Sequence, residues 1–403
     1  MTDVPQLIIN TPVTLAVAIM ALWLGVQINR RVAFLHNYNI PPAVTGGLPI
    51  SALVAVAELG SGWEIRFDLQ LRDLLLIAFF STIGLSARFR QMLEGGKALL
   101  LMLGLAVVLL LFQNLTGVVI ALLAGERPLY GLIGGSISLA GGHGTAITWG
   151  QLFEEHFAIV DASSLGMAFA TAGLITGGLI GGPVGAYLIR RHQLQADPRD
   201  PALPVLEVGK ETIYQINLNG LLTGVLLVAL CFALGAAVYD WVVTLGIRVP
   251  AFLTAMFLGI VLTNGLELCR VAVDYRPVQL IGDISLQLFL GMSLISLPLL
   301  ALQGALGMIG LVMVLQAVVI TLFTLWLVFP LLGRNYDAAC ISAGFIGMGL
   351  GATPVGIANM NALTNRFGPS PKAYLVIPLL GAFFIDIANA TLVQLLLGFS
   401  YFS

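Results

Sequence analysis

Two glycine-rich stretches decide the fold of this chain: YGLIGGSISLAGGHGTAITWGQLF at Tyr130–Phe153 and AACISAGFIGMGLGATPVGIANM at Ala338–Met360. Both are apolar, and each is interrupted near its centre, by GGHGT at Gly141–Thr145 and by GLGATP at Gly349–Pro354. The pieces that flank each interruption are about 10–12 residues long, or about 15–18 Å as helix. A hydrocarbon core is about 30 Å thick. We therefore expect each stretch to enter and leave a membrane on the same side, as a re-entrant hairpin.

The composition places these stretches in a membrane protein. Of the 403 residues, 58% are hydrophobic and 9% are charged, whereas an ordinary globular domain has about 25% charged residues. So few charges cannot cover the surface of a water-soluble fold of this size. The net charge of −2 provides no basic field for nucleic acid. Because the N-terminus has no basic segment ahead of its first apolar run, we expect that run to remain as a helix.

Ten apolar runs have the length and composition of membrane helices. They cover about 12–29, 42–58, 71–87, 97–123, 163–189, 213–238, 249–264, 279–297, 304–332 and 373–397. With the N-terminus outside, fourteen of the eighteen Lys and Arg residues fall on inner connections and four on outer ones. Since positive residues favour the cytoplasmic side, we expect a multi-pass protein of the bacterial inner membrane with both termini in the periplasm.

The most polar stretch divides the chain near its midpoint and reads as a cytoplasmic linker at 191–212. Landmark residues recur across it at a nearly constant offset of 208 to 210: Pro42 and Pro250, Asp73 and Asp283, Thr145 and Thr353, Gly173 and Gly381. Five spans in each half is an odd number, so the second half must lie inverted relative to the first. Inverted repeats are typical of alternating-access transporters, whose substrate sites lie near the membrane midplane.

The predicted fold class is therefore an all-α polytopic membrane protein. Its ten transmembrane helices form two inverted-topology five-helix repeats. The N-terminal repeat covers 1–190 with a re-entrant hairpin at about 129–153, and the C-terminal repeat covers 213–403 with a hairpin at about 338–360. On this topology the first hairpin enters from outside and the second from inside, so that their tips meet near the middle of the membrane.

The two tips are the candidate substrate site. Non-helical backbone at membrane depth must be buried in protein or line a wet cavity, and half-helix N-termini suit a carboxylate. Neither stretch contains an arginine, so an anion would be held by amides, hydroxyls and a co-bound cation. The candidate substrate-binding residues are Ser136, Ser138, Gly142, His143, Gly144, Thr145, Gly351, Ala352, Thr353, Pro354, Asn359 and Asp386. The candidate Na+ ligands are Asp386, Asn389, Thr353, Asn359 and Gly349.

Ionisable residues within the predicted spans are the strongest site candidates. A charge at the bilayer centre costs at least about 2.5–3.5 kcal/mol, so such residues are rare and usually functional. Asp386 is the only acidic residue well inside a predicted span, one helical turn from Asn389. It is predicted to bind Na+ or a substrate ammonium group; the alternative is a hydrogen-bond acceptor between helices. Asp73 and Asp283 are expected to cap their helices; the alternative is that they gate a vestibule. For His143 both a carboxylate-binding and a structural role stay open.

The motifs taken in order resemble the bacterial sodium/glutamate symporters. GGHGT is followed by NYDAA, GLGATP, GPS and GAFFIDIANA, and the likeness includes NYNIPPAVTGGL, GWEIRFD, RDLLLIAFFSTIGL and GGLIGGPV. The resemblance implies a Na+-coupled glutamate carrier that is homodimeric and moves a transport domain against a scaffold, in an elevator-type mechanism. Local departures, AITWGQ after the first tip and FIGMGLGATP at the second, bear on specificity rather than on class.

Other classes are weighed against this prediction. No HExxH, GxSxG or Walker-type motif is present, so an enzyme is not expected. A Na+- or H+-coupled carrier of another organic anion, such as citrate or another dicarboxylate, stays open from hydropathy alone. Expected partners are glutamate, sodium ions, membrane lipids and a second copy of the chain, without an organic cofactor. The Leu- and Val-rich spans at about 97–123 and 304–332 are expected to face lipid or a partner protomer, away from the site.

Overall fold

The structure, a computed structural model, describes residues 5–32, 35, 40–89, 96–196, 218–245, 249–271, 273–399 and 402. Most of the predicted linker at 191–212 lies outside these residues, from residue 197 onward. Within the described part the regular elements are helices, apart from the two strands β1 (Gln6–Ile9) and β2 (Glu64–Phe67). These strands pair in parallel, with Gln6 opposite Glu64.

Eight helical stretches in the described residues are long and apolar enough to cross a membrane. They are α1 (Thr11–Arg31), α3 (Pro42–Ser61), α6 (Gly96–Leu123), α9 (Ala162–Arg191), α10 (Leu218–Thr244), α11 (Ala251–Leu268), α12 (Arg276–Ile295) and the run Gln303–Leu331, which contains α13 (Leu306–Phe323). These helices confirm the prediction of a polytopic helical membrane protein.

The two other predicted spans are also helical, but in shorter pieces. The span predicted at 71–87 corresponds to α4 (Gln70–Ser86), which has 17 residues. The span predicted at 373–397 is made of α17 (Pro371–Leu379) and α18 (Ile385–Leu397), joined by the π-helical turn η4 (Leu380–Phe384). Pro378 lies in the last turn of α17, where its missing N–H interrupts the regular helical ladder.

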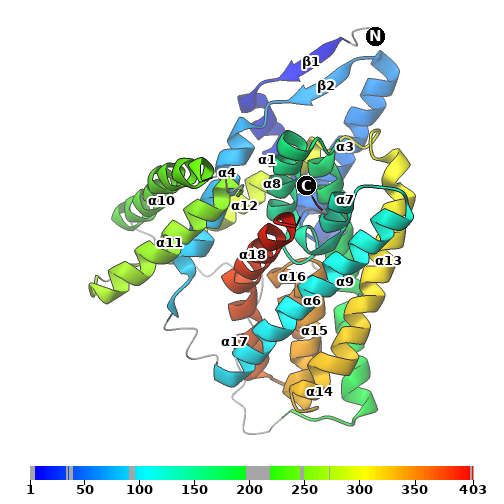
Figure 1. The fold of residues 1–403 in the computed structure, drawn as a ribbon, viewed down its shortest axis with the longest axis vertical. Helices are drawn as coiled ribbons and strands as arrows, with labels where there is room; N and C mark the ends of the chain where they lie inside the picture. The colour runs from blue at the N-terminus through cyan, green and yellow to red at the C-terminus, as the bar shows by residue number, and fades with distance from the viewer. Residues whose placement is uncertain are drawn as a thin grey trace. The chain divides into compact units, whose positions relative to one another are not determined.

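The chain folds into two compact units, and each unit combines segments from both sides of the polar stretch. Unit 1 contains Met1–Arg88 and Ile213–Gly304, and unit 2 contains Phe89–Thr212 and Ala305–Ser403. In Figure 1 the blue and yellow-green helices belong to unit 1, while α6, α9, α13 and the orange and red helices belong to unit 2. Packing thus joins the early part of one half with the early part of the other.

In unit 1, α4 packs against α11 and α12, and α1 packs against α3 and α12. The rings of Phe80 and Phe252 stack with centroids 4.0 Å apart. Thr263 Oγ1 donates to the carbonyl of Leu85 at 2.6 Å. A side chain at Gly84 would overlap the Met256 carbonyl, so a close approach of α4 and α11 requires glycine there.

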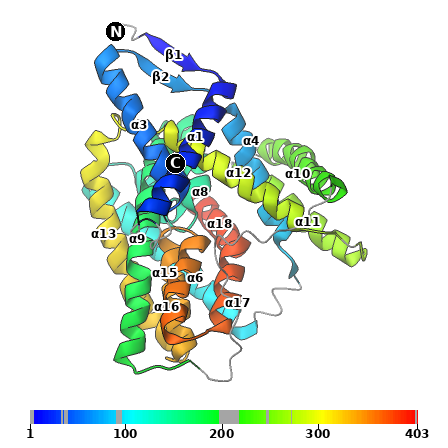
Figure 2. The ribbon, with the colours of Figure 1, turned by 180° about the vertical axis from the view of Figure 1, so that it is seen from behind.

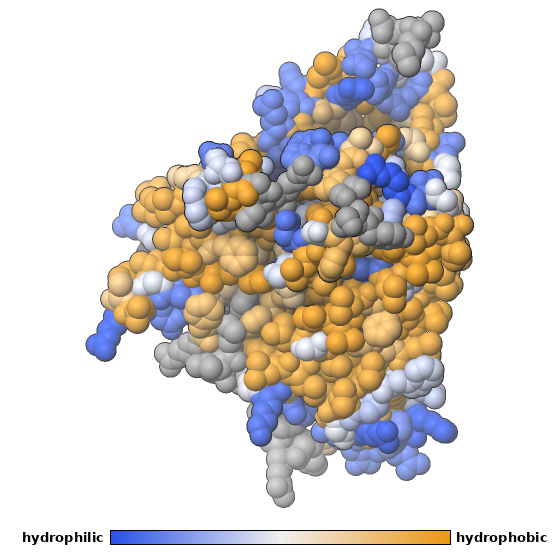
Figure 3. All heavy atoms as spheres, in the orientation of Figure 1, coloured by the Kyte–Doolittle hydropathy of each residue, from blue (hydrophilic) through white to orange (hydrophobic). Residues whose placement is uncertain are grey.

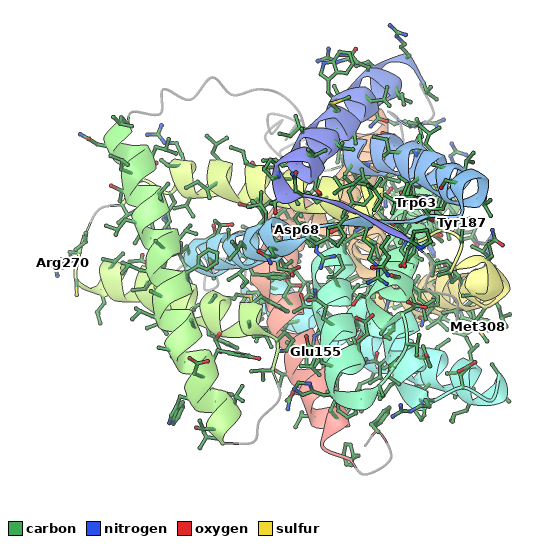
Figure 4. All side chains as sticks on the ribbon, turned by 90° about the horizontal axis from the view of Figure 1, so that it is seen from above. Trp63, Asp68, Glu155, Tyr187, Arg270 and Met308 are labelled. Carbon is green, nitrogen blue, oxygen red and sulfur yellow. The ribbon has the colours of Figure 1, made fainter. Side chains whose placement is uncertain are left out.

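The structure corrects the expectation that Asp73 and Asp283 cap their helices. Asp73 does not cap α4, because it pairs with the adjacent Arg72, whose Nη2 lies 2.7 Å from its Oδ1. Asp283 lies inside α12 rather than at its start. Asp68, which follows β2 and is labelled with Trp63 in Figure 4, accepts hydrogen bonds from Thr11 Oγ1 and from the Gln70 N–H. These two donors lower the pKa of Asp68.

In unit 2, α9 packs against the helices of both glycine-rich stretches, as Figure 2 shows for the second. A side chain at Gly173 would overlap the Leu350 carbonyl, and one at Gly181 would overlap the Asn359 amide, so the glycines of α9 permit this contact. The outer faces of α6 and α13 expose apolar residues such as Leu115 and Val314. Figure 3 shows hydrophobic side chains covering the region where these two helices lie in Figure 1.

Candidate functional site

The first glycine-rich stretch is a broken helix. It consists of α7 (Pro128–Leu132), the π-helical turn η1 (Ile133–Ile137), a non-helical link, and α8 (Gly142–Phe157). Gly135 has the non-helical angles φ −103°, ψ −136°, and Gly142 has φ +71°. Glycine adopts positive φ without the steric cost that other residues have. The GG pairs of the sequence therefore mark where the helix breaks.

The second stretch is a broken helix of the same kind. It consists of α15 (Tyr336–Leu350) and α16 (Thr353–Phe367), separated by Gly351 and Ala352. Asn335 caps α15 by accepting a 2.9 Å hydrogen bond from the Ala338 N–H. Each arm has 15 residues, longer than expected from the sequence. At about 22 Å an arm remains shorter than a hydrocarbon core.

Both broken helices return to where they started, and their ends are tied in equivalent ways. Tyr130 OH donates to the Val160 carbonyl at 3.2 Å, and Tyr336 OH donates to the Gly368 carbonyl at 2.5 Å. The two tyrosines are 206 residues apart and the two acceptors 208. The second base is further closed by Ser370 Oγ, which donates to Asp337 at 2.6 Å. The NYDAA and GPS motifs thus hold the two ends of one hairpin together.

The two breaks meet inside unit 2. A Cβ placed on Gly142 would lie 3.4 Å from the carbonyl oxygen of Gly351, which is van der Waals contact. The N-terminus of α8 is therefore adjacent to the end of α15.

Side chains predicted at the first tip are almost completely buried. Ser136 donates from its N–H to Asn114 Oδ1 at 3.0 Å, and its Oγ lies 2.9 Å from that same atom and 2.5 Å from Asn389 Oδ1. Ser138 Oγ has no hydrogen-bond partner among the described residues. Thr145 Oγ1 donates to the Ile137 carbonyl at 2.6 Å. Thr145 therefore satisfies a backbone carbonyl of the break itself, whereas Ser136 joins the break to amide side chains of α6 and α18.

His143 and Gly144 lie in the first turn of α8, next to Gly142. His143 Nε2 is 3.0 Å from Thr171 Oγ1 on α9, and the imidazole is buried. The carbonyl of Gly144 accepts from Thr148 Oγ1 at 2.7 Å within the helix. The histidine thus has a structural partner in this conformation.

Residues predicted at the second tip divide into two groups. Gly351, Ala352, Thr353 and Pro354 form the break and the first turn of α16. Thr353 lies against Gly381 of η4. A side chain at position 381 would overlap the hydroxyl group of Thr353. Asn359 lies further along α16, and its Nδ2 donates to the Gly177 carbonyl on α9 at 3.0 Å. The structure thus places Asn359 against α9.

Asp386 and Asn389 lie on one face of α18, three residues apart. Asn389 Nδ2 donates to the Ser136 carbonyl at 3.0 Å, which brings α18 to the first tip. Asp386 is 8% exposed, and among the described residues no hydrogen bond or ion pair holds its carboxylate. A buried carboxylate without a partner is costly unless a cation or a proton compensates its charge. Oxygen ligands of this kind suit a hard cation.

Sequence reasoning missed three buried amide side chains: Gln113, Asn114 and Gln316. Gln113 Nε2 donates to the Gly349 carbonyl at 2.7 Å, and Gln316 Nε2 donates to the Gly134 carbonyl at 3.2 Å. Their helices α6 and α13 therefore contact the broken segments on one face and are apolar on the other, which corrects the expectation that these spans lie away from the site. The available signal was an isolated Gln-Asn pair in a Leu- and Val-rich span.

Comparison with known proteins identifies the family of this chain. The family model described as sodium/glutamate symporter matches residues 7–369. A sodium/glutamate symporter of Escherichia coli (strain K12) is 40% identical over 398 residues, covering 98% of this chain and 99% of the relative. One from Haemophilus influenzae is 35% identical over 389 residues, covering 96% of each chain. With near-complete coverage and both glycine-rich breaks inside the matched region, the chain belongs to the sodium/glutamate symporter family.

Proposed function

We propose that the protein takes up glutamate with Na+ by alternating access, with the substrate held where the two broken helices meet. The observation that carries this proposal is the contact of the two breaks at Gly142 and Gly351. Family membership supports the substrate and the coupling ion. Glycine-rich backbone at such a point presents both amide donors and carbonyl acceptors, which suit a zwitterionic amino acid and a cation.

The residues divide by chemistry in this proposal. The start of α8, at Gly142, His143 and Gly144, offers backbone amides and the positive end of a helix dipole to a substrate carboxylate. Asp386 on α18 provides negative charge for Na+ or for the substrate ammonium group. The other predicted residues complete this set with hydroxyl, amide and carbonyl groups: Ser136, Ser138, Thr145, Gly349, Gly351, Ala352, Thr353, Pro354, Asn359 and Asn389.

The charge of glutamate constrains the number of ions. Glutamate carries one negative charge, and an inside-negative potential opposes its uptake by about 2.3 kcal/mol per 100 mV. One Na+ only neutralises the substrate, so at least two are required for the potential to drive uptake. A solid-supported-membrane measurement with zero net current at saturating glutamate and Na+ would reject this stoichiometry.

We further propose ten spans arranged as two inverted five-helix repeats, at 1–190 and 213–403, with the two hairpins entering from opposite sides. Support comes from the equivalent tyrosine-to-carbonyl ties of Tyr130 and Tyr336, since such a pair is expected of one ancestral fold used twice. In this arrangement both termini are periplasmic, the protein lies in the inner membrane, and it works as a homodimer of elevator type.

Transport assays test the proposal directly. Purified protein in liposomes should accumulate radiolabelled glutamate when Na+ is supplied outside, and the signal should disappear with K+ or choline instead. Unlabelled glutamate should compete, whereas citrate should not. Competition by citrate but not by glutamate would favour the alternative, a carrier of another organic anion.

A further inference from the structure

Each break exposes a backbone carbonyl that a helix would normally satisfy. At the first break, the Ser138 N–H donates to the Gly135 carbonyl, whereas in a regular α-helix it would donate to Gly134. At the second, Gly349 lies in the last turn of α15, where carbonyls have no partner within the helix. In a regular α-helix the donor for Gly349 would be the N–H of Thr353, but Thr353 begins the next helix, α16. The Ala352 N–H donates to the Gly347 carbonyl instead of to that of Met348, which shows that the ladder is already broken there.

Glutamine side chains supply the missing donors, and each comes from the other half of the chain. Gln316 on α13 donates to the Gly134 carbonyl in the first stretch at 3.2 Å, and Gln113 on α6 donates to the Gly349 carbonyl in the second at 2.7 Å. Gln316 Nε2 also donates to the backbone carbonyl of Gln113 at 2.9 Å. Each side chain therefore reaches the opposite half of the chain, and the Gln316 side chain is also linked to the backbone of Gln113.

These hydrogen bonds are costly to lose because both glutamines and both carbonyls are buried. Gln113 and Gln316 are both 0% exposed, and Gly134 and Gly349 are buried too. Without its glutamine, each carbonyl would lack a donor in an apolar interior, where such a group is costly. Because Gln316 Nε2 faces two carbonyl oxygens, its amide orientation is set by its surroundings. Apolar side chains fill the remainder of the α6–α13 contact, including the ring pair of Phe112 and Phe323.

We propose that Gln113 and Gln316 are reciprocal positioning residues that hold the two tips at the separation needed to bind one substrate between them. Gln113 positions the second tip, and Gln316 positions the first. The inference deepens the proposed function and rests on it for the identity of the substrate. The structural part of the proposal is that each tip is held by a glutamine from the other half of the chain, which we call the crossed dependence. This part does not depend on which substrate is transported.

Hydrogen–deuterium exchange of the full-length protein in lipid nanodiscs tests the crossed dependence. Gln113→Met should raise amide exchange about tenfold in peptides covering 347–353 and leave 134–141 unchanged, and Gln316→Met should do the reverse. Methionine retains an unbranched chain of similar length but cannot donate. A tenfold rise corresponds to about 1.4 kcal/mol of local opening. Gln113→Leu and Gln316→Leu are measured in parallel. If a methionine variant does not fold, the leucine variant at the same position still tests the prediction.

Gln394→Met is the matched control. Gln394 lies on α18 in the same unit, and its Oε1 is also buried. Among the described residues, no hydrogen bond joins this Oε1 to either break. The control should leave both tip regions unchanged. Exchange that rises in both tips for each variant, or in neither, would overturn the proposal, because that pattern shows general loosening or no role.

Transport kinetics separate positioning from stability. For both methionine variants the KM for glutamate should rise about tenfold while the maximal rate per folded protein changes less than twofold. Loss of maximal rate at unchanged KM would contradict positioning. If wild-type protein does not transport glutamate with Na+ yet the crossed exchange pattern is present, the proposed substrate fails and the positioning role stands.

Discussion

The contact between Asn389 and Ser136 allows a structural role to be separated from ion binding. Asn389→Ala removes a 3.0 Å hydrogen bond to the Ser136 carbonyl and an acceptor 2.5 Å from the Ser136 hydroxyl. Each loss is partly compensated. The carbonyl keeps the Gly141 N–H at 3.0 Å, and the single hydroxyl proton can still bind Asn114 Oδ1 at 2.9 Å.

The structural cost of this substitution is therefore that of one ordinary hydrogen bond, about 1 kcal/mol, rather than that of an orphaned buried group. If the binding-competent state becomes less stable by this amount, apparent affinities for Na+ and glutamate fall by about fivefold at most. We expect a larger effect, because the amide oxygen of Asn389 is a proposed Na+ ligand. The half-saturating Na+ concentration should rise more than tenfold.

The assay is Na+-dependent glutamate uptake into proteoliposomes across a range of Na+ concentrations. Ser136→Ala is the reference for the half-saturating Na+ concentration, since it removes the hydroxyl side of the same contact and leaves the Asn389 oxygen in place. The half-saturating glutamate concentration is not compared, because Ser136 is itself a proposed substrate-binding residue. If the half-saturating Na+ concentration of Asn389→Ala rises fivefold or less, as in Ser136→Ala, the role of Asn389 is only structural, through its hydrogen bonds to the first break. In that case it should be removed from the ion site.

Three further substitutions test the site and the repeat. Asp386→Asn should abolish Na+-dependent uptake, because it removes the only buried negative charge that we propose for the ion. Gel filtration should show that the variant is still folded, and retained stimulation of uptake by Na+ would contradict the prediction. Gly142→Ala should lower the melting temperature and weaken glutamate binding, because alanine at φ +71° costs about 1–2 kcal/mol. In the control Gly104→Ala a Cβ has open space within α6, so the melting temperature should not fall and glutamate binding should not change; equal losses in the two variants would refute the argument. Tyr130→Phe and Tyr336→Phe should each cost about 0.5–1.5 kcal/mol of stability, measured by thermal unfolding in detergent, and a large effect from only one of them would weaken the proposed equivalence.

Much of the fold follows from the sequence alone because burial in lipid leaves few choices for a backbone. An apolar run must form a helix in a hydrocarbon core, since every N–H and C=O group has to be satisfied within it. The helical membrane class and the approximate positions of its long helices were predictable for that reason. The breaks at Gly141–Thr145 and Gly349–Pro354 were predictable too, because glycine clusters and proline mark where a helix stops.

Only the tertiary structure decided which side chains support those breaks. Gln113 and Gly349 are 236 residues apart, and Gln316 and Gly134 are 182 apart. No local pattern encodes such pairs, because they depend on which helix faces pack together. The same holds for Asn359, which lies in a glycine-rich stretch but binds α9. Local sequence thus determines where the helices must break, whereas the packing of distant helices determines which groups satisfy the backbone that each break exposes.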